Sequence, residues 1–333
     1  MEIHALLAYS LAGLLAALLA LYVILDGFDL GVGVVSLVAC SENRRDVMMV
    51  SLGPVWDGNE TWLVMLGGTL FGAFPLVYAV VLHALYVPVI LMLFGLIFRG
   101  VAFEFREHAK SKRPWNYAFA LGSLLAAASQ GFILGGWIQG IKVSDGRFAG
   151  GLWDWATPYA AFLALSVICG YVLLGVTYLI HKTSGDMQAM ARKRARYMLY
   201  VLAVLSLGVM IWTPVVQQRS LLDYLAGPQI IFPLLGLGLF GLLYHSLKAQ
   251  REHSPFLYTV GIFTVSLAGL VVSMAPYVVY PSISITAAAA PTFSLAVMVF
   301  GVGFLMPVLI AYNAYQYWTF RGKIQEGESY QRV

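Results

Sequence analysis

Four carboxylates and one arginine stand inside the apolar stretches of the first hundred residues: Asp26, Asp29, Asp57, Glu60 and Arg99. Ionisable groups at membrane depth are costly, so they usually face the protein interior or water and mark a route for ions or protons. A buried carboxyl that can hold or release a proton is what a proton relay needs. The alternative is that these charges only pair with one another and lock helices together.

The elements that must position these charges are membrane-spanning helices. Hydrophobic residues make up 60% of the 333 residues and charged residues 11%, with a mean hydropathy of +0.80, which excludes an ordinary soluble globular protein. A span needs about 20 mostly apolar residues. Nine windows meet this requirement, near 6–39, 51–73, 76–105, 115–139, 158–180, 197–216, 229–247, 256–275 and 292–318. The sequence therefore predicts an all-α polytopic membrane protein.

Lys and Arg are distributed unevenly between the two sides of this arrangement. Sixteen of them fall after the first, third, fifth and seventh windows or in the C-terminal tail, and three fall on the opposite side. Short cytoplasmic loops carry the excess of positive residues, so we expect an outside N-terminus and a cytoplasmic C-terminus. The net charge of +4 is then explained by topology, and no nucleic-acid partner is expected.

The spacing places the charges at similar depths. With a rise of 1.5 Å per residue, Asp57 and Arg99 lie roughly 10 Å from the cytoplasmic ends of their helices, and Asp29 lies roughly 15 Å from its own. We expect Arg99 to neutralise one acid, while the surplus acids are protonated, reach water or are compensated by another chain. Asp26 shares a helix face with Asp29, as Glu60 does with Asp57.

Other residues that could carry chemistry are weaker candidates. Cys40 and Cys169 are expected near or inside different spans, where they form neither a disulfide framework nor a metal site. The histidines lie at span ends or in loops, except His83, which is expected well inside the third window and is better explained by packing than as a haem ligand. Trp56 and Trp62 can be read as aromatic packing or as the lining of a gas or quinone route.

The intramembrane charges are confined to the first four windows, which suggests one functional and one supporting half. We expect a first bundle of four helices, a second bundle of four and a ninth helix with a cytoplasmic tail, over residues 1–140, 155–276 and 290–333. An interfacial aromatic belt is expected near the end of the last window, formed by Tyr312, Tyr315, Tyr317 and Trp318.

Three motifs carry a resemblance to a known family. They are DGFDLGVG at 26–33, WDGNETW at 56–62 and FRGVAFE at 98–104, followed by GWIQG at 136–140. Together they resemble the second subunit of cytochrome bd-type quinol oxidases, and the short chain is more similar to the cyanide-insensitive branch of that family. The resemblance covers nearly the whole chain and implies two four-helix bundles plus one peripheral helix.

The resemblance also implies a function, cofactors and partners. The chain would be subunit II of a quinol:dioxygen oxidoreductase, a terminal oxidase of the bacterial cytoplasmic (inner) membrane. The larger subunit I would carry haem b and haem d, or a b-type substitute, so this chain is expected to ligate no haem and no metal. Further expected partners are quinol, dioxygen, the lipid bilayer and, as an open alternative, a small single-helix accessory subunit. Some family members hold a structural quinone in this subunit.

Residue roles can be carried over from the same resemblance. The proton-path residues would be Asp57, Asp29, Arg99, Asp26 and Glu60. Asp57 would lie on a polar path that starts in the cytoplasm and crosses the subunit interface. Trp62 matches a residue near a hydrophobic dioxygen route, on which Trp56 would also lie. Gly100 stands where some relatives have proline, which leaves the helix geometry near Arg99 open.

Two other functions are compatible with the charges. A proton-coupled membrane transporter could use Asp29, Asp57 and Arg99 for substrate and proton, but transporters commonly have discontinuous helices in both repeated halves. Here only the first half is charged and broken. A purely structural scaffold subunit would use the same charges for helix packing alone.

Overall fold

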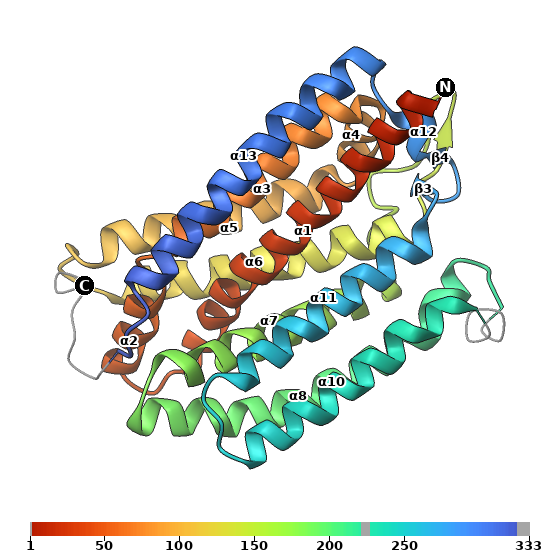
Figure 1. Ribbon diagram of the computed structural model, residues 1–333. Coiled ribbons are helices and arrows are strands. Elements are labelled where there is room, and N and C mark those ends of the chain that lie inside the picture. Colours follow the sequence, from red (N-terminus) through yellow and green to blue (C-terminus); the bar gives the residue numbers. More distant parts are fainter. Residues whose placement is uncertain (1, 221–226, 325–333) are drawn as a thin grey trace.

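Long helices dominate the computed structural model, which describes residues 2–220 and 227–324 (Figure 1). Within this described part, eight helices are long and apolar enough to cross a membrane: α1 (Glu2–Ser36), α5 (Tyr86–Arg106), α6 (Arg113–Ile138), α7 (Pro158–Lys182), α8 (Gly185–Val216), α10 (Ile231–Lys248), α11 (Ser254–Met274) and α13 (Thr292–Thr319). A bent pair, α3 (Trp56–Ala73) and α4 (Pro75–Ala84), adds a ninth if it is counted as one span. The prediction of an all-α polytopic membrane protein is confirmed.

Short elements cap the two ends of the bundle. The N-terminus, α12 (Ile285–Ala288) and the hairpin of β3 (Tyr277–Val279) and β4 (Ile283–Ser284) lie at one end (Figure 1). A second small antiparallel hairpin joins β1 (Val143–Ser144) to β2 (Arg147–Phe148), and η1 (Pro228–Ile230) precedes α10. The helix α2 (Glu42–Leu52) and the C-terminal end of α13 lie at the opposite end of the bundle.

The third predicted span is wrong at its N-terminal end. Residues 76–105 do not form one helix, because α4 ends at Ala84 and α5 begins at Tyr86. Pro75 starts α4 with its ring in the first turn, and the chain bends by 120° between α3 and α4. His83 therefore lies in α4, where it is exposed beside the Phe148 ring at a centroid distance of 5.3 Å, and α5 alone forms the span.

Small residues let the central helices approach closely. A Cβ atom on Gly31 of α1 would overlap the carbonyl oxygen of Tyr171 on α7. Between α5 and α6, a Cβ on Gly95 would lie 2.6 Å from the Gly122 oxygen. Close packing of this kind is how helices associate inside a bilayer, where burial of apolar surface gives little advantage. It also leaves no space for lipid beside the charges that α1 and α5 carry.

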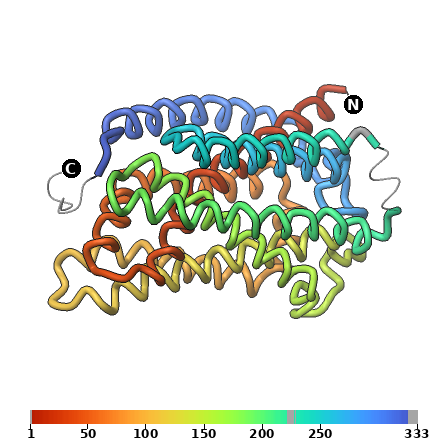
Figure 2. The backbone as a smooth tube through the Cα atoms, turned by 90° about the horizontal axis from the view of Figure 1, so that it is seen from below, coloured from red at the N-terminus to blue at the C-terminus, as the bar shows by residue number. Residues whose placement is uncertain are grey.

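Helix α7 lies at the centre of the contacts between helices, because it packs on α1, α6, α8 and α11. α7, α8, α10 and α11 contact one another, while α1 contacts α3, α6 and α7, and α5 packs on α6. The last helix, α13, lies against α1 and α3 along the outside of the bundle (Figures 1 and 2). The division into residues 1–140, 155–276 and 290–333 remains a prediction, and the tail over 325–333 lies outside the described residues.

Candidate functional site

One buried guanidinium connects three helices in the interior. Arg99 of α5 and Asp26 of α1 are both fully buried, and the Arg99 Nη1 atom donates to Asp26 Oδ1 at 2.5 Å. The Arg99 Nη2 atom donates to Glu60 of α3, whose side chain is 27% exposed. Charge-assisted hydrogen bonds are the strongest kind in proteins. Arg99 therefore holds α1, α3 and α5 together through a charge that neither water nor lipid reaches.

The pairing of the acids with Arg99 differs from the prediction made from the sequence. Arg99 was expected to neutralise one acid, yet it pairs with two, Asp26 and Glu60. Asp29, one turn after Asp26 on α1, is fully buried and accepts a hydrogen bond from Asn59 Nδ2 at 2.8 Å. Asp57 is exposed in the first turn of α3, three residues before Glu60. The structure thus gathers four of the five predicted residues and leaves Asp57 at the edge of the group.

The buried group carries more acid than base. One guanidinium faces the three carboxyls of Asp26, Asp29 and Glu60. Three side-chain atoms of this group have no hydrogen-bond partner among the described residues: Asp26 Oδ2, Asp29 Oδ1 and Arg99 Nε. Buried polar groups are nearly always hydrogen-bonded, and an uncompensated buried charge is expensive. The arrangement is therefore suited to holding a proton on one of its carboxyls.

The last helix closes the group from the other side. Asn59 of α3 accepts a hydrogen bond from the Tyr317 hydroxyl at 2.8 Å, and the Trp62 indole donates to Asn313 Oδ1 at 3.0 Å. Tyr317 was predicted to belong to an interfacial aromatic belt, but its hydroxyl points inward to α3. The other three members of that predicted belt are exposed: Tyr312, Tyr315 and Trp318. α13 therefore clamps α3 against α1.

The two candidate tryptophans have different surroundings. Trp62 is buried among apolar side chains of α1 and α13, including Leu18 and Val302. Trp56 is partly exposed and stacks on Phe103 of α5 with ring centroids 5.0 Å apart. Both rings contribute to packing in the region between α3 and its neighbours.

Three polar residues near the charges were not predicted from the sequence. Tyr171 of α7 donates to Gln130 of α6 at 2.5 Å, and Gln130 in turn donates to the Tyr22 hydroxyl of α1 at 2.8 Å. Tyr22 lies one turn before Asp26 on the same helix. The signal for them in the sequence was Gln130, a polar amide in the middle of the predicted span 115–139.

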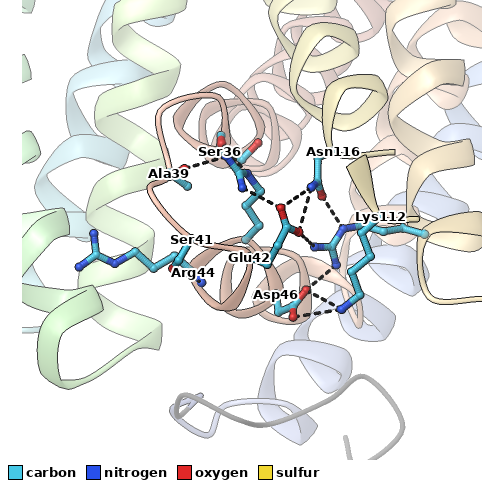
Figure 3. A network of polar contacts seen from close by, with 10 residues as sticks. Ser36, Ala39, Ser41, Glu42, Arg44, Asp46, Lys112 and Asn116 are labelled. Carbon is cyan, nitrogen blue, oxygen red and sulfur yellow. Dashed lines mark hydrogen bonds and ion pairs between the residues drawn. The ribbon is translucent and has the colours of Figure 1, made fainter. Parts of the chain in front are cut away.

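A second network joins the C-terminal end of α5 to α2 and α6 (Figure 3). Arg106, two turns beyond Arg99 on α5, is buried and pairs with Asp46 at 2.6 Å and Glu42 at 3.2 Å, both on α2. Asn116 of α6 donates to both oxygens of Glu42 at 2.9 Å. This network anchors α2 and so fixes the short segment from which α3 starts.

The electrostatics of Glu42 follow from these contacts. Partial burial acts to raise the pKa of Glu42, but the hydrogen bond from Asn116 and the charges of Arg45 and Arg106 outweigh it and hold the pKa below its usual range. Glu42 is thus an anion at neutral pH and a stable counter-ion for Arg106.

The histidines of this chain do not fit the ligation of a haem. Haem iron in oxidases and globins is held by side chains that face it from a buried pocket. None of the six histidines is buried, and the described residues contain no group of three His, Cys, Asp or Glu side chains that could hold a metal ion. His181 and His253 lie together, with their Nδ1 atoms 2.7 Å apart, at the exposed end of α7.

Comparisons with known proteins agree with this architecture. The family model described as cytochrome bd terminal oxidase subunit II matches residues 7–320. The chain is 26% identical to cytochrome bd-I ubiquinol oxidase subunit 2 of Escherichia coli (strain K12), with 93% of both chains covered. It is 27% identical to cytochrome bd ubiquinol oxidase subunit 2 of Bacillus subtilis (strain 168), over 95% of this chain and 96% of the relative.

A solved structure shares the fold. The bd oxidase from Geobacillus thermodenitrificans superposes with a TM-score of 0.71 at 19% identity, covering 94% of this chain and 98% of that chain. The family match spans nearly the whole sequence and includes all of the helices that carry the buried charges. The chain therefore belongs to the cytochrome bd terminal oxidase subunit II family.

Proposed function

We propose that this chain is the supporting and proton-admitting half of a quinol oxidase. Its family makes it a subunit of a haem-containing terminal oxidase, an oxidoreductase complex whose relatives are bacterial ubiquinol oxidases. The partner is subunit I and the substrate is a quinol. The carrying observation is the buried Arg99 group, in which one guanidinium faces the carboxyls of Asp26, Asp29 and Glu60.

The proposed reaction sets what the chain must supply. Two quinols are oxidised to two quinones, and one dioxygen receives four electrons and four protons to give two waters. Haem b and haem d, or a b-type substitute for haem d, would supply the electron transfer and oxygen reduction in subunit I. A small single-helix subunit would complete the complex. The residues of this chain touch none of the reacting atoms in this proposal; they carry protons and support subunit I.

The proposed path starts at the cytoplasmic end of α3. Asp57 is exposed in the first turn, and Glu60 is partly exposed one turn deeper and bonded to Arg99. Asp26 and Asp29 lie behind this pair and are fully buried. An exposed acid, a partly exposed acid and two buried acids in succession form a graded series from water to the interior. Relays in membrane proteins use chains of this kind.

The remaining elements of the proposal rest on the family. The N-terminus lies outside and the C-terminus in the cytoplasm, as the distribution of Lys and Arg favours. The proposal includes a dioxygen route beside Trp62, in its apolar cluster with α1 and α13, or beside Trp56, which stacks on Phe103 of α5. A structural quinone in this chain is part of the same proposal, without an assigned residue.

The first experiment purifies the complex through a tag on this chain. We expect haem bands in the visible difference spectrum and quinol-driven oxygen uptake. Asp57→Asn should lower oxygen uptake and leave the bands intact. The matched control is Asp154→Asn, an exposed acid of the loop before α7 that pairs only with Lys142 at 3.1 Å among the described residues.

Two results would redirect the assignment. A well-folded preparation without haem and without oxygen uptake would contradict the oxidase function, and uptake of a solute by the isolated chain in liposomes would then favour the transporter alternative. Equal oxygen uptake in Asp57→Asn, Asp29→Asn and the control would support a purely structural scaffold.

A further inference from the structure

A chain of donors outside the family motifs points toward Asp26. The Tyr171 hydroxyl donates to Gln130 Oε1 at 2.5 Å, and Gln130 Nε2 donates to the Tyr22 hydroxyl at 2.8 Å. The Tyr22 oxygen is thus an acceptor, which leaves its own hydrogen free to be donated. Asp26 lies one turn further along α1, where residues four apart are neighbours, and its Oδ2 atom has no hydrogen-bond partner among the described residues.

Asp29 has no comparable set of hydrogen-bond donors. Its Oδ2 atom accepts from the neutral amide of Asn59 at 2.8 Å, and its Oδ1 atom has no hydrogen-bond partner among the described residues. The Asn59 oxygen is itself occupied by the Tyr317 hydroxyl. No guanidinium or ammonium group donates to Asp29 within the described chain, whereas Asp26 is bonded directly to Arg99.

Titratable and charged groups of several helices surround the two acids. The titratable and charged groups facing Asp26 and Asp29 are Tyr22 on α1, Glu60 on α3, Arg99 on α5, Tyr171 and Tyr178 on α7, and Tyr317 on α13. Arg99 is the only cation in this set, and it is shared between Asp26 and Glu60.

Hydrogen bonds to the charged form of a carboxyl favour that form, and donors linked in series polarise one another. Asp26 is bonded to a guanidinium, and the Tyr22 hydroxyl at the end of the donor chain lies one turn from it, whereas Asp29 receives one neutral amide. Two neighbouring buried carboxylates cannot both be ionised cheaply. We propose that Gln130 and Tyr22 are positioning residues that keep Asp26 ionised against Arg99, so that the exchangeable proton of this group resides on Asp29. This inference rests on the proposed function, because it assigns one step of the proton path.

Infrared difference spectroscopy of the intact complex tests the assignment. The C=O stretch of a protonated carboxyl is distinct from that of a carboxylate, and it moves to lower frequency in D₂O. We expect a protonated-carboxyl band in the wild type that is lost in Asp29→Asn and kept in Asp26→Asn. The reverse pattern, with the band lost only in Asp26→Asn, would overturn the proposal.

The positioning role has its own variants. Tyr22→Phe removes one hydroxyl and keeps the ring, and Gln130→Leu interrupts the chain at its centre. A hydrogen bond to a charged group corresponds to a change of about 10- to 100-fold in a proton equilibrium. We therefore expect a second protonated-carboxyl band, from Asp26, in both variants.

A matched control separates this effect from the loss of any buried hydroxyl. Tyr159→Phe removes the hydroxyl of another buried tyrosine of α7, which is bonded to Thr213 at 2.8 Å and lies away from the acids. The control should keep the wild-type spectrum. If Tyr22→Phe gave the same spectrum as Tyr159→Phe, the positioning role would be refuted.

The infrared result and the oxidase assay report on different claims. Loss of the band in Asp29→Asn with normal oxygen uptake would support the location of the proton and contradict only its delivery to the oxygen-reducing site. Retention of the band in Asp29→Asn would contradict the inference while leaving the oxidase function untouched.

Discussion

Replacement of Arg99 by methionine should destabilise the protein by an amount that depends on pH. The substitution leaves Asp26 fully buried without its cation, while Glu60, with 27% of its side chain exposed, can turn to water. Asp26 must then be protonated in the folded state. Protonation of an aspartate with the ordinary pKa of about 3.9 costs about 4 kcal/mol near pH 7 and about 1.5 kcal/mol near pH 5. The first figure agrees with the roughly 3–5 kcal/mol lost when one partner of a buried ion pair is removed.

The direction in which the stability of Arg99→Met changes with pH follows from proton binding. The folded variant binds a proton on Asp26 that the unfolded chain releases above its ordinary pKa, so the stability of the variant rises as the pH falls. Denaturant unfolding of the purified complex near pH 7 and near pH 5 measures the difference. The control is Arg106→Met, because the partners of Arg106, Glu42 and Asp46, reach water and need no proton.

A second variant isolates the buried charge. Arg99→Met combined with Asp26→Asn removes the acid together with its cation, and replacing both partners of a buried pair is far less costly than removing one. We expect the double variant to be more stable than Arg99→Met near pH 7. If Arg99→Met lost the same stability at both pH values, or if the double variant were no better, Arg99 would not be the counter-ion of Asp26.

Three further outcomes follow from the structure. Gly31→Ala should cost about 1–3 kcal/mol, because the new methyl group meets the Tyr171 carbonyl, whereas Gly67→Ala, in open space, should leave the thermal midpoint unchanged. The lowered pKa of Glu42 means that its stabilisation is complete above the unfolded pKa of about 4.3 and is lost as the pH falls further, so the stability curve of Glu42→Gln should be flatter in that acid range. His83→Ala should leave the haem spectrum of the complex unchanged, since His83 is exposed in α4; a lost haem band would show otherwise.

Composition and motif spacing were enough to predict the spans and the presence of buried charges. Stretches of about 20 apolar residues have one stable form in lipid, because every backbone polar group must be satisfied within the helix. The break between α4 and α5 at Leu85 was missed because apolar residues continue through it. The break between the second and third windows was predicted, and Pro75 marks it at the first position of α4.

The partners of Arg99 could not be read from the sequence. Four acids lie at depths that Arg99 can reach. Which of them pair with Arg99 depends on how α1, α3 and α5 are rotated about their axes. That rotation is set by contacts such as Gly31 against Tyr171, which become visible only when the helices are packed. Tyr317 was misassigned for the same reason, since an aromatic residue near a helix end can face either lipid or a neighbouring helix.

The contact between Asn59 and Tyr317 has a consequence for biosynthesis. The two residues are separated by 258 positions, so the first helices are made long before the last one can close over them. At about 5–20 residues per second, this interval lasts roughly 13 to 50 s. During that time the polar face of α3 is without its cover from α13, although Arg99 can already bind Asp26. A nascent chain stalled before α13 should therefore be an early target for membrane quality-control proteases.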